Sequence, residues 1–280
     1  LATEAILANG SVEQKEKWLP KLASGEVVGT FALAEGSGRP SAESLNTRFE
    51  AGKLTGKKLP VPDGNIADFA VIVTKSDTGD GASLALVELK QEAVIRSSVR
   101  TLDFSRGHAS IEFKGAEAEI LGADGSGWSA MESLMDRAAV MFAWEQVGIA
   151  DAALEQARDY AMGRYAFGRA IASYQAIKHK LADMYVKNTL ARSNCYYGAW
   201  ALNSDSSELG LAAATARVGA IQASVNAAQE NVQTHGGMGF TWEFDCQFFY
   251  RRAKLLSVNI GSEGFWQDKL ITAYEQSNVA

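Results

Sequence analysis

The placement of proline divides this chain into two parts that are expected to fold differently. All four prolines lie at or before Pro62, and none occurs in the remainder of the 280 residues. Proline removes a hydrogen-bond donor and clashes with the preceding turn of a helix, so a long proline-free stretch is compatible with long helices. The second part is therefore predicted to be helical, and the first part more irregular.

Hydrophobic periodicity agrees with this division. Short strand-like runs fill the region from 27 to 121, and turn-forming residues such as those at 77–81 separate them. The runs are Val27–Leu33, Phe69–Thr74, Ser83–Glu88, Ala93–Ser97, Ala109–Phe113 and Glu119–Leu121. The period then becomes helical, in Trp128–Arg164, Ile171–Asn203, Glu208–His235 and Glu263–Ser277. The pattern predicts an α+β fold in which a small β-barrel or sandwich precedes an up-and-down helical bundle.

The first 25 residues have a helical pattern of their own. Ser11 followed three residues later by Gln14 is a capping signal, and it predicts a short helix at Glu13–Leu19 that Pro20 closes. This segment is too short to form a domain.

Composition excludes several classes of function. The chain carries 27 basic and 33 acidic residues, for a net charge of −6, and it has no basic run that would bind nucleic acid. Cys195 and Cys246 lie far apart without CxxC spacing, so we expect two buried thiols, no metal site and a reducing, cytoplasmic location. We also expect no membrane span and no export signal, because a long apolar run and a basic, cleavable leader are both missing.

Three groups of residues carry a resemblance to one family. The first comprises Gly10–Pro20, continuing to Phe31–Glu35; the second comprises Arg164–Gly168 and Gln175–Met184; the third comprises Gln233–Thr241 and Tyr250–Lys254. In order and spacing they resemble the corresponding segments of acyl-CoA dehydrogenases, and the similarity covers essentially the whole chain. The resemblance implies FAD as cofactor, an acyl-CoA thioester as substrate and an electron-transfer acceptor as partner.

The resemblance also implies a domain plan. Members of this family have an N-terminal helical domain, a central β domain and a C-terminal four-helix domain. By that comparison, residues 1–26 are the end of the first domain, 27–122 form the second and 123–280 form the third. Most of the first domain lies outside the sequence, and we expect either that its helices were removed or that another polypeptide replaces them.

The FAD contacts that the resemblance implies are chemically reasonable. In the family, the C-terminal domain of one subunit holds the adenosine-diphosphate half of its neighbour's FAD. Arg164 offers a guanidinium for pyrophosphate, and the glycine turn lets backbone approach a phosphate closely. Taken singly, such residues are usually surface or turn residues, and it is their conjunction that favours a cofactor site. The predicted contacts are Arg164, Phe167, Gln175, Gln233, Gly236 and Gly237. His235 is expected to bond the backbone of the turn.

The catalytic base that the family requires is missing. Desaturation needs a carboxylate to remove the α-proton. By the resemblance, its usual position is Ile260 and its alternative position is Ala138. The segments that contact the flavin ring have also diverged: the family's T-E-P-G-x-G-S-D is A-E-G-S-G-R-P-S at 34–41, and K-x-W-I-x-N-G corresponds to 57–64, where no tryptophan occurs.

These observations predict a subunit that completes the active site of a partner. The partner would be a homologous subunit carrying the glutamate, in a dimer of heterodimers similar to the actinobacterial acyl-CoA dehydrogenases that act on steroid side chains. One alternative is a self-sufficient homotetramer in which Glu263 or Glu145 is the base; we expect instead that Glu263 begins the last helix and that Glu145 makes a buried polar contact. The other alternative is a flavin-free structural or binding subunit.

Overall fold

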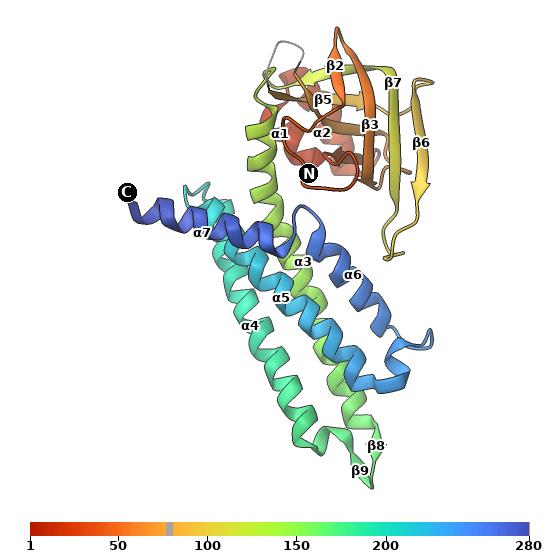
Figure 1. Cartoon of the computed structure of the whole chain (residues 1–280), viewed down its shortest axis with the longest axis vertical. Coiled ribbons are helices and arrows are strands. Elements are labelled where there is room, and N and C mark those ends of the chain that lie inside the picture. The colour runs from red at the N-terminus through yellow and green to blue at the C-terminus, as the bar shows by residue number, and fades with distance from the viewer. Residues whose placement is uncertain (77–80, 280) are drawn as a thin grey trace. The chain divides into compact units, whose positions relative to one another are not determined.

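The computed structural model describes residues 1–76 and 81–279, and Figure 1 labels its elements. The chain separates into two compact units, Leu1–Leu134 and Met135–Ala280. The α+β class is confirmed, with the sheet in the first unit and a helical region in the second. The finer division into residues 1–26, 27–122 and 123–280 stays a prediction. The turn predicted at 77–81 lies, apart from Gly81, outside the described residues.

The sheet of the first unit closes on itself. Its strands are β1 (Gly29–Ala32), β2 (Arg48–Glu50), β3 (Lys53–Pro62), β4 (Phe69–Lys75), β5 (Ala82–Glu88), β6 (Val94–Val99) and β7 (His108–Leu121). The order β4-β2-β3-β7-β5 returns to β4 through the β4–β5 pair, while β1 joins β4 and β6 joins β7. Closure leaves few free edges and encloses one apolar core that includes Leu54, Ile72, Val87 and Ile111. The barrel alternative of the sequence analysis is therefore the better description.

Three strands differ from the sequence-based expectation, and the first of them, β2, lies outside every predicted run. Strand β3 was not predicted, because Pro60 and Pro62 argue against a strand. The β3–β7 register shifts between Lys58 and Val61, and this irregularity accommodates the proline that cannot donate to the ladder. Strand β7 is continuous across Lys114–Ala118, where two separate strands were expected, because β3 pairs with it as far as Glu117 and β5 pairs with it from Ala118 onward.

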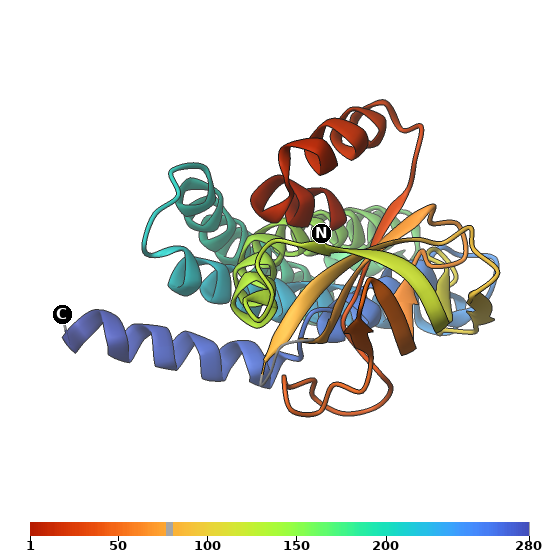
Figure 2. The same ribbon diagram turned by 90° about the horizontal axis from the view of Figure 1, so that it is seen from above.

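The N-terminal helices α1 (Ala2–Asn9) and α2 (Val12–Ser24) lie on one side of the sheet (Figure 2). The capping box is confirmed: Ser11 Oγ accepts from the Gln14 N–H at 3.2 Å, and Gln14 Oε1 accepts from the Ser11 N–H at 3.1 Å. The expectation that Pro20 ends the helix was wrong, since α2 continues to Ser24. The ring of Trp18 packs 4.3 Å from Phe69, and this burial offsets the hydrogen bond that Pro20 removes.

The second unit is built from long helices. They are α3 (Gly127–Gly163), which begins in the first unit, α4 (Gln175–Asn203), α5 (Leu209–His235), α6 (Cys246–Val258) and α7 (Glu263–Val279). Their core is rich in alanine, including Ala143, Ala157, Ala191, Ala216 and Ala227. Small side chains let helix axes approach closely, which suits a bundle. Helix α6, in which only four residues are buried, was not predicted as a separate element.

No helix in the described part of the chain combines the length and the apolar character needed to cross a bilayer.

Candidate functional site

The predicted cofactor contacts gather at one end of the helical unit, where α3 and α5 end and α4 begins (Figure 1). The rings of Tyr160 and His235 stack at 4.0 Å and join the ends of α3 and α5. Lys180 pairs with Glu230 and joins the start of α4 to the last turns of α5. On this frame stand Arg164 after α3, Phe167 in a short hairpin, Gln175 opening α4, Gln233 in the last turn of α5, and Gly236 and Gly237 in the turn that follows.

These residues lie on the surface of the helical unit. Arg164, Gln175 and Gln233 are exposed, and Phe167 as a whole residue is 96% exposed. Gly236 has φ +60°, a conformation that favours glycine, and a Cβ at either Gly236 or Gly237 would meet no heavy atom within 4 Å. A guanidinium, two amides, a free aromatic face and an open glycine turn make a donor set suited to the phosphates and base of a nucleotide. The residues present therefore fit the nucleotide end of FAD.

His235 makes a different contact from the one expected. Its Nδ1 lies 2.9 Å from the Asn231 carbonyl, one helical turn earlier, and not against the backbone of the glycine turn. The ring is buried between Tyr160 and Phe244, and burial lowers the pKa of His235 although the Asn231 contact opposes this. His235 thus ties helix ends together. Sequence periodicity does not reveal this aromatic cluster, because Tyr160 lies 75 residues before His235.

Neither position expected for the base holds a proton acceptor. Ile260 lies in the turn between α6 and α7 with φ +56°, and Ala138 is buried in α3. A positive φ is rare for a β-branched residue, so the turn must be held by its surroundings. The buried guanidinium of Arg217 provides this, because it donates to the carbonyl oxygens of Leu256 and, at 2.7 Å, of Asn259. Sequence reasoning had missed Arg217.

The two alternative carboxylates already have partners. Glu145 accepts from Arg252 Nε at 2.9 Å and from a second nitrogen of the same guanidinium at 2.5 Å; the expected buried contact is a half-buried ion pair. Glu263 opens α7 and accepts from Gln222 at 2.8 Å and from Gln267 at 3.0 Å. A carboxylate in the first turn of a helix also interacts favourably with the helix dipole. Both contacts give these carboxylates structural roles.

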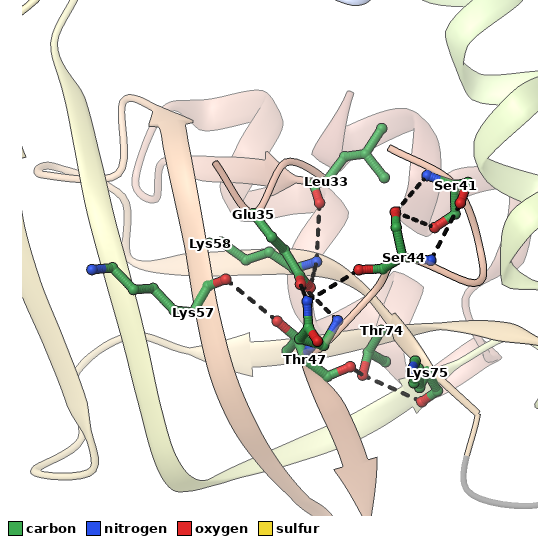
Figure 3. A network of polar contacts seen from close by, with 10 residues as sticks. Leu33, Glu35, Ser41, Ser44, Thr47, Lys57, Lys58, Thr74 and Lys75 are labelled. Atoms are coloured by element: carbon green, nitrogen blue, oxygen red, sulfur yellow. Dashed lines mark hydrogen bonds and ion pairs between the residues drawn. The ribbon is translucent and has the colours of Figure 1, made fainter. Parts of the chain in front are cut away.

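The first unit contains an ion pair that joins the segments 34–41 and 57–64, which were predicted above to have diverged from the family (Figure 3). Lys58 is fully buried in β3, and its Nζ donates to Glu35 at 2.8 Å and to the Leu33 carbonyl at 3.0 Å. Glu35 also accepts from the backbone N–H groups of Asn46 at 2.6 Å and Thr47 at 3.0 Å. Glu35 thereby fastens both ends of the segment 35–47 to the sheet.

Both groups of this pair are ionised near neutral pH. Burial by itself raises the pKa of Glu35, but the bond to the Lys58 ammonium and the Thr47 N–H outweigh it and lower that pKa to about 2. Burial lowers the pKa of Lys58 to about 8, although Glu35 opposes the shift. The pair therefore persists from mildly acidic to neutral conditions.

This geometry predicts an acid-sensitive unit. A carboxylate whose pKa is lowered on folding stabilises the folded state above its unfolded pKa and loses that effect as pH falls through its folded pKa. We expect the stability contributed by Glu35 to disappear between pH 4.5 and about 2. Urea unfolding at several pH values measures it, and Glu35→Gln should flatten the curve in this window. An unchanged acid limb in that variant would contradict the prediction.

The described residues outside this ion pair include two cysteines but no cluster of metal ligands. Within residues 1–76 and 81–279, no three His, Cys, Asp or Glu side chains are grouped to hold a metal ion. Cys195 and Cys246 are buried free thiols, and burial raises their pKa to about 12 and about 11. Such thiols are poor nucleophiles.

Comparison with known proteins identifies relatives over most of the chain. The family model described as "Acyl-CoA dehydrogenase, C-terminal domain" matches residues 125–271. An acyl-CoA dehydrogenase of Bacillus subtilis (strain 168) is 34% identical over 274 residues, covering 94% of this chain and 72% of that protein. Butyryl-CoA dehydrogenase from Megasphaera elsdenii superposes with a TM-score of 0.93 at 24% identity, covering 98% of this chain and 75% of that one. A variant of the Tcur3481–Tcur3483 steroid ACAD superposes with a TM-score of 0.87 at 24% identity, covering 100% of this chain and 75% of that one.

Proposed function

Because the chain belongs to the acyl-CoA dehydrogenase family, we propose that it is the subunit that grips the nucleotide end of FAD while a homologous partner subunit carries the catalytic glutamate. The family consists of FAD-dependent oxidoreductases. The reaction would be α,β-desaturation of an acyl-CoA thioester, with the bound FAD accepting a hydride and an electron-transfer protein reoxidising it. The assembly would be a dimer of heterodimers.

One observation carries this proposal: an aliphatic side chain, Ile260, occupies the position that the family resemblance assigns to the base, while the predicted cofactor contacts Arg164, Phe167, Gln175 and Gln233 are all exposed. Isoleucine and the alternative Ala138 cannot remove a proton. Glu145 and Glu263 are held by Arg252 and by two glutamines. A chain of this kind is unsuited to catalysis alone but suited to holding the cofactor of a neighbour. The free buried thiols support a reducing, cytoplasmic location.

A CoA-linked steroid side chain is the finer substrate proposal. It is motivated by the split between the two functions and by the fold-level likeness to the Tcur3481–Tcur3483 steroid ACAD. Turnover of steroid side-chain CoA thioesters by the complex, compared with straight-chain acyl-CoA of similar length, tests this extension separately.

Arg164→Ala tests the central proposal. The variant, co-purified with a homologous subunit that retains the glutamate, should bind FAD tenfold to a hundredfold more weakly, because a charge-assisted hydrogen bond contributes about 1.5–3 kcal/mol. The measurement is titration of the flavin-stripped complex with FAD, together with the flavin content of the purified complex. Arg158→Ala is the matched control, since Arg158 lies near the end of α3, which Arg164 directly follows, is exposed and pairs with its neighbour Asp159.

Two results would contradict the proposal. Unchanged FAD binding in the Arg164→Ala complex would remove the cofactor role and favour the flavin-free alternative. Efficient desaturation by the isolated chain, abolished in Glu263→Gln or Glu145→Gln, would favour the self-sufficient homotetramer.

A further inference from the structure

The hairpin that carries Phe167 is too small to hold its own shape. Strands β8 (Tyr165–Ala166) and β9 (Arg169–Ala170) have two residues each, and the two residues of the turn, Phe167 and Gly168, have φ +53° and +80°. Positive φ at both positions is the pattern of a type I′ hairpin turn. Even a longer two-stranded hairpin is only marginally stable in water, so contacts outside the ladder must fix this one.

Tyr174 supplies such contacts to both strands. Its hydroxyl donates to the Ala166 carbonyl in β8 at 3.0 Å, and the guanidinium of Arg169 in β9 lies over its ring, 4.0 Å from the centroid. A cation over an aromatic face is attracted by the ring quadrupole. Through these two contacts, Tyr174 holds both strands of the hairpin next to the start of α4.

Tyr174 is connected to the proposed cofactor residues that precede it and to the one that follows it in the sequence. Arg164 directly precedes β8, and its carbonyl accepts from the Ile171 N–H at 2.8 Å, which closes the base of the hairpin. Phe167 forms the tip. Tyr174 itself is the N-cap residue of α4 and is joined by a peptide bond to Gln175. One side chain thus links the segment bearing the guanidinium and the aromatic ring to the helix start bearing the amide.

From these contacts we infer that Tyr174 is a positioning residue for the nucleotide end of FAD, acting through the hairpin and without needing to touch the cofactor. The inference rests on the proposed function. Its physical basis is preorganisation: a hairpin fixed before binding loses less conformational freedom when the ligand arrives. The Tyr174 hydroxyl is the critical group, because its hydrogen bond to Ala166 fixes β8, the strand that follows Arg164.

Tyr174→Phe tests this in the complex of the chain with its homologous partner, stripped of flavin and titrated with FAD. The variant keeps the ring under Arg169 and loses only the bond to Ala166. We expect Kd for FAD to rise about fivefold to tenfold, as the loss of one hydrogen bond implies, while Tm changes by less than about 1 °C because the hairpin lies outside the core. Tyr185→Phe is the control, an exposed tyrosine on the same helix whose change should alter neither quantity.

Combining Arg164→Ala with Tyr174→Phe distinguishes a role of Tyr174 in positioning the cofactor residues from a general contribution to the stability of the unit. If Tyr174 acts through the hairpin, its replacement should change Kd less than twofold once Arg164 is alanine, because neighbouring sites on one path are not additive. Equal effects in both backgrounds would overturn the inference, as would a loss of affinity matched by a fall in Tm. Wild-type affinity in Tyr174→Phe with weak binding in Arg164→Ala refutes this inference alone, whereas wild-type affinity in Arg164→Ala refutes the proposed function.

Discussion

Replacing Lys58 with methionine is expected to destabilise the first unit by about 3 kcal/mol, within the range seen when one partner of a buried ion pair is removed. The Glu35 side chain is only 13% exposed and loses its counter-charge in this variant. The Leu33 carbonyl also loses its donor. The bonds that Glu35 accepts from Asn46 and Thr47 remain, and they keep the effect at the lower end of that range.

Hydrogen exchange measured by mass spectrometry on peptides of β3 and β4 reports this change, because it follows the first unit by itself in a chain of two units. Lys57→Met, one residue away and exposed, should stay within about 0.5 kcal/mol of wild type. Lys58→Met combined with Glu35→Gln should recover part of the loss, since no unpaired charge is then buried. If the double variant is as unstable as the sum of the two single variants, the pair is not coupled.

Replacing Arg217 with methionine is expected to destabilise the helical unit by about 3–5 kcal/mol, since leaving buried acceptors unpaired costs about 1–3 kcal/mol for each group. The guanidinium is fully buried and donates to the carbonyl oxygens of Leu256 and Asn259 and to the side chain of Gln146. Burial lowers its pKa to about 10, with Glu145 opposing, so it remains a cation at neutral pH. The carbonyl groups at the end of α6 are the favourable place for such a charge.

Urea unfolding followed by circular dichroism at 222 nm measures this effect. Arg217→Lys should lie between methionine and wild type, because an ammonium keeps the charge but lacks the planar fork that reaches several acceptors. Arg158→Met, which alters an exposed local pair, should change stability by less than about 1 kcal/mol. A small effect of Arg217→Met would mean that the turn containing Ile260 holds its positive φ without the guanidinium.

Several features could be predicted because they depend on neighbouring residues. The capping box at Ser11 and Gln14 forms as expected, and the change from strand to helical period near residue 127 marks the start of α3. The predicted helix boundaries also placed Arg164 and Gln233 at or near helix ends. In contrast, Pro20 lies inside α2 and two prolines lie inside β3, although proline disfavours both helices and strands. Packing against the rest of the unit outweighs the lost hydrogen bonds.

The identity of the side chains at 260 and 138 is covalent, so the sequence alone determined that neither position can supply a base, and the spacing of the Arg164 and Gln233 segments pointed to the family. Only the tertiary structure decided which partners distant residues have: Lys58 with Glu35, Arg217 with the end of α6, Glu145 with Arg252, and Tyr174 with the hairpin. The physical reason is that an ion pair or hydrogen bond depends on a few ångströms of separation, which the packing of whole elements sets and which local periodicity does not encode.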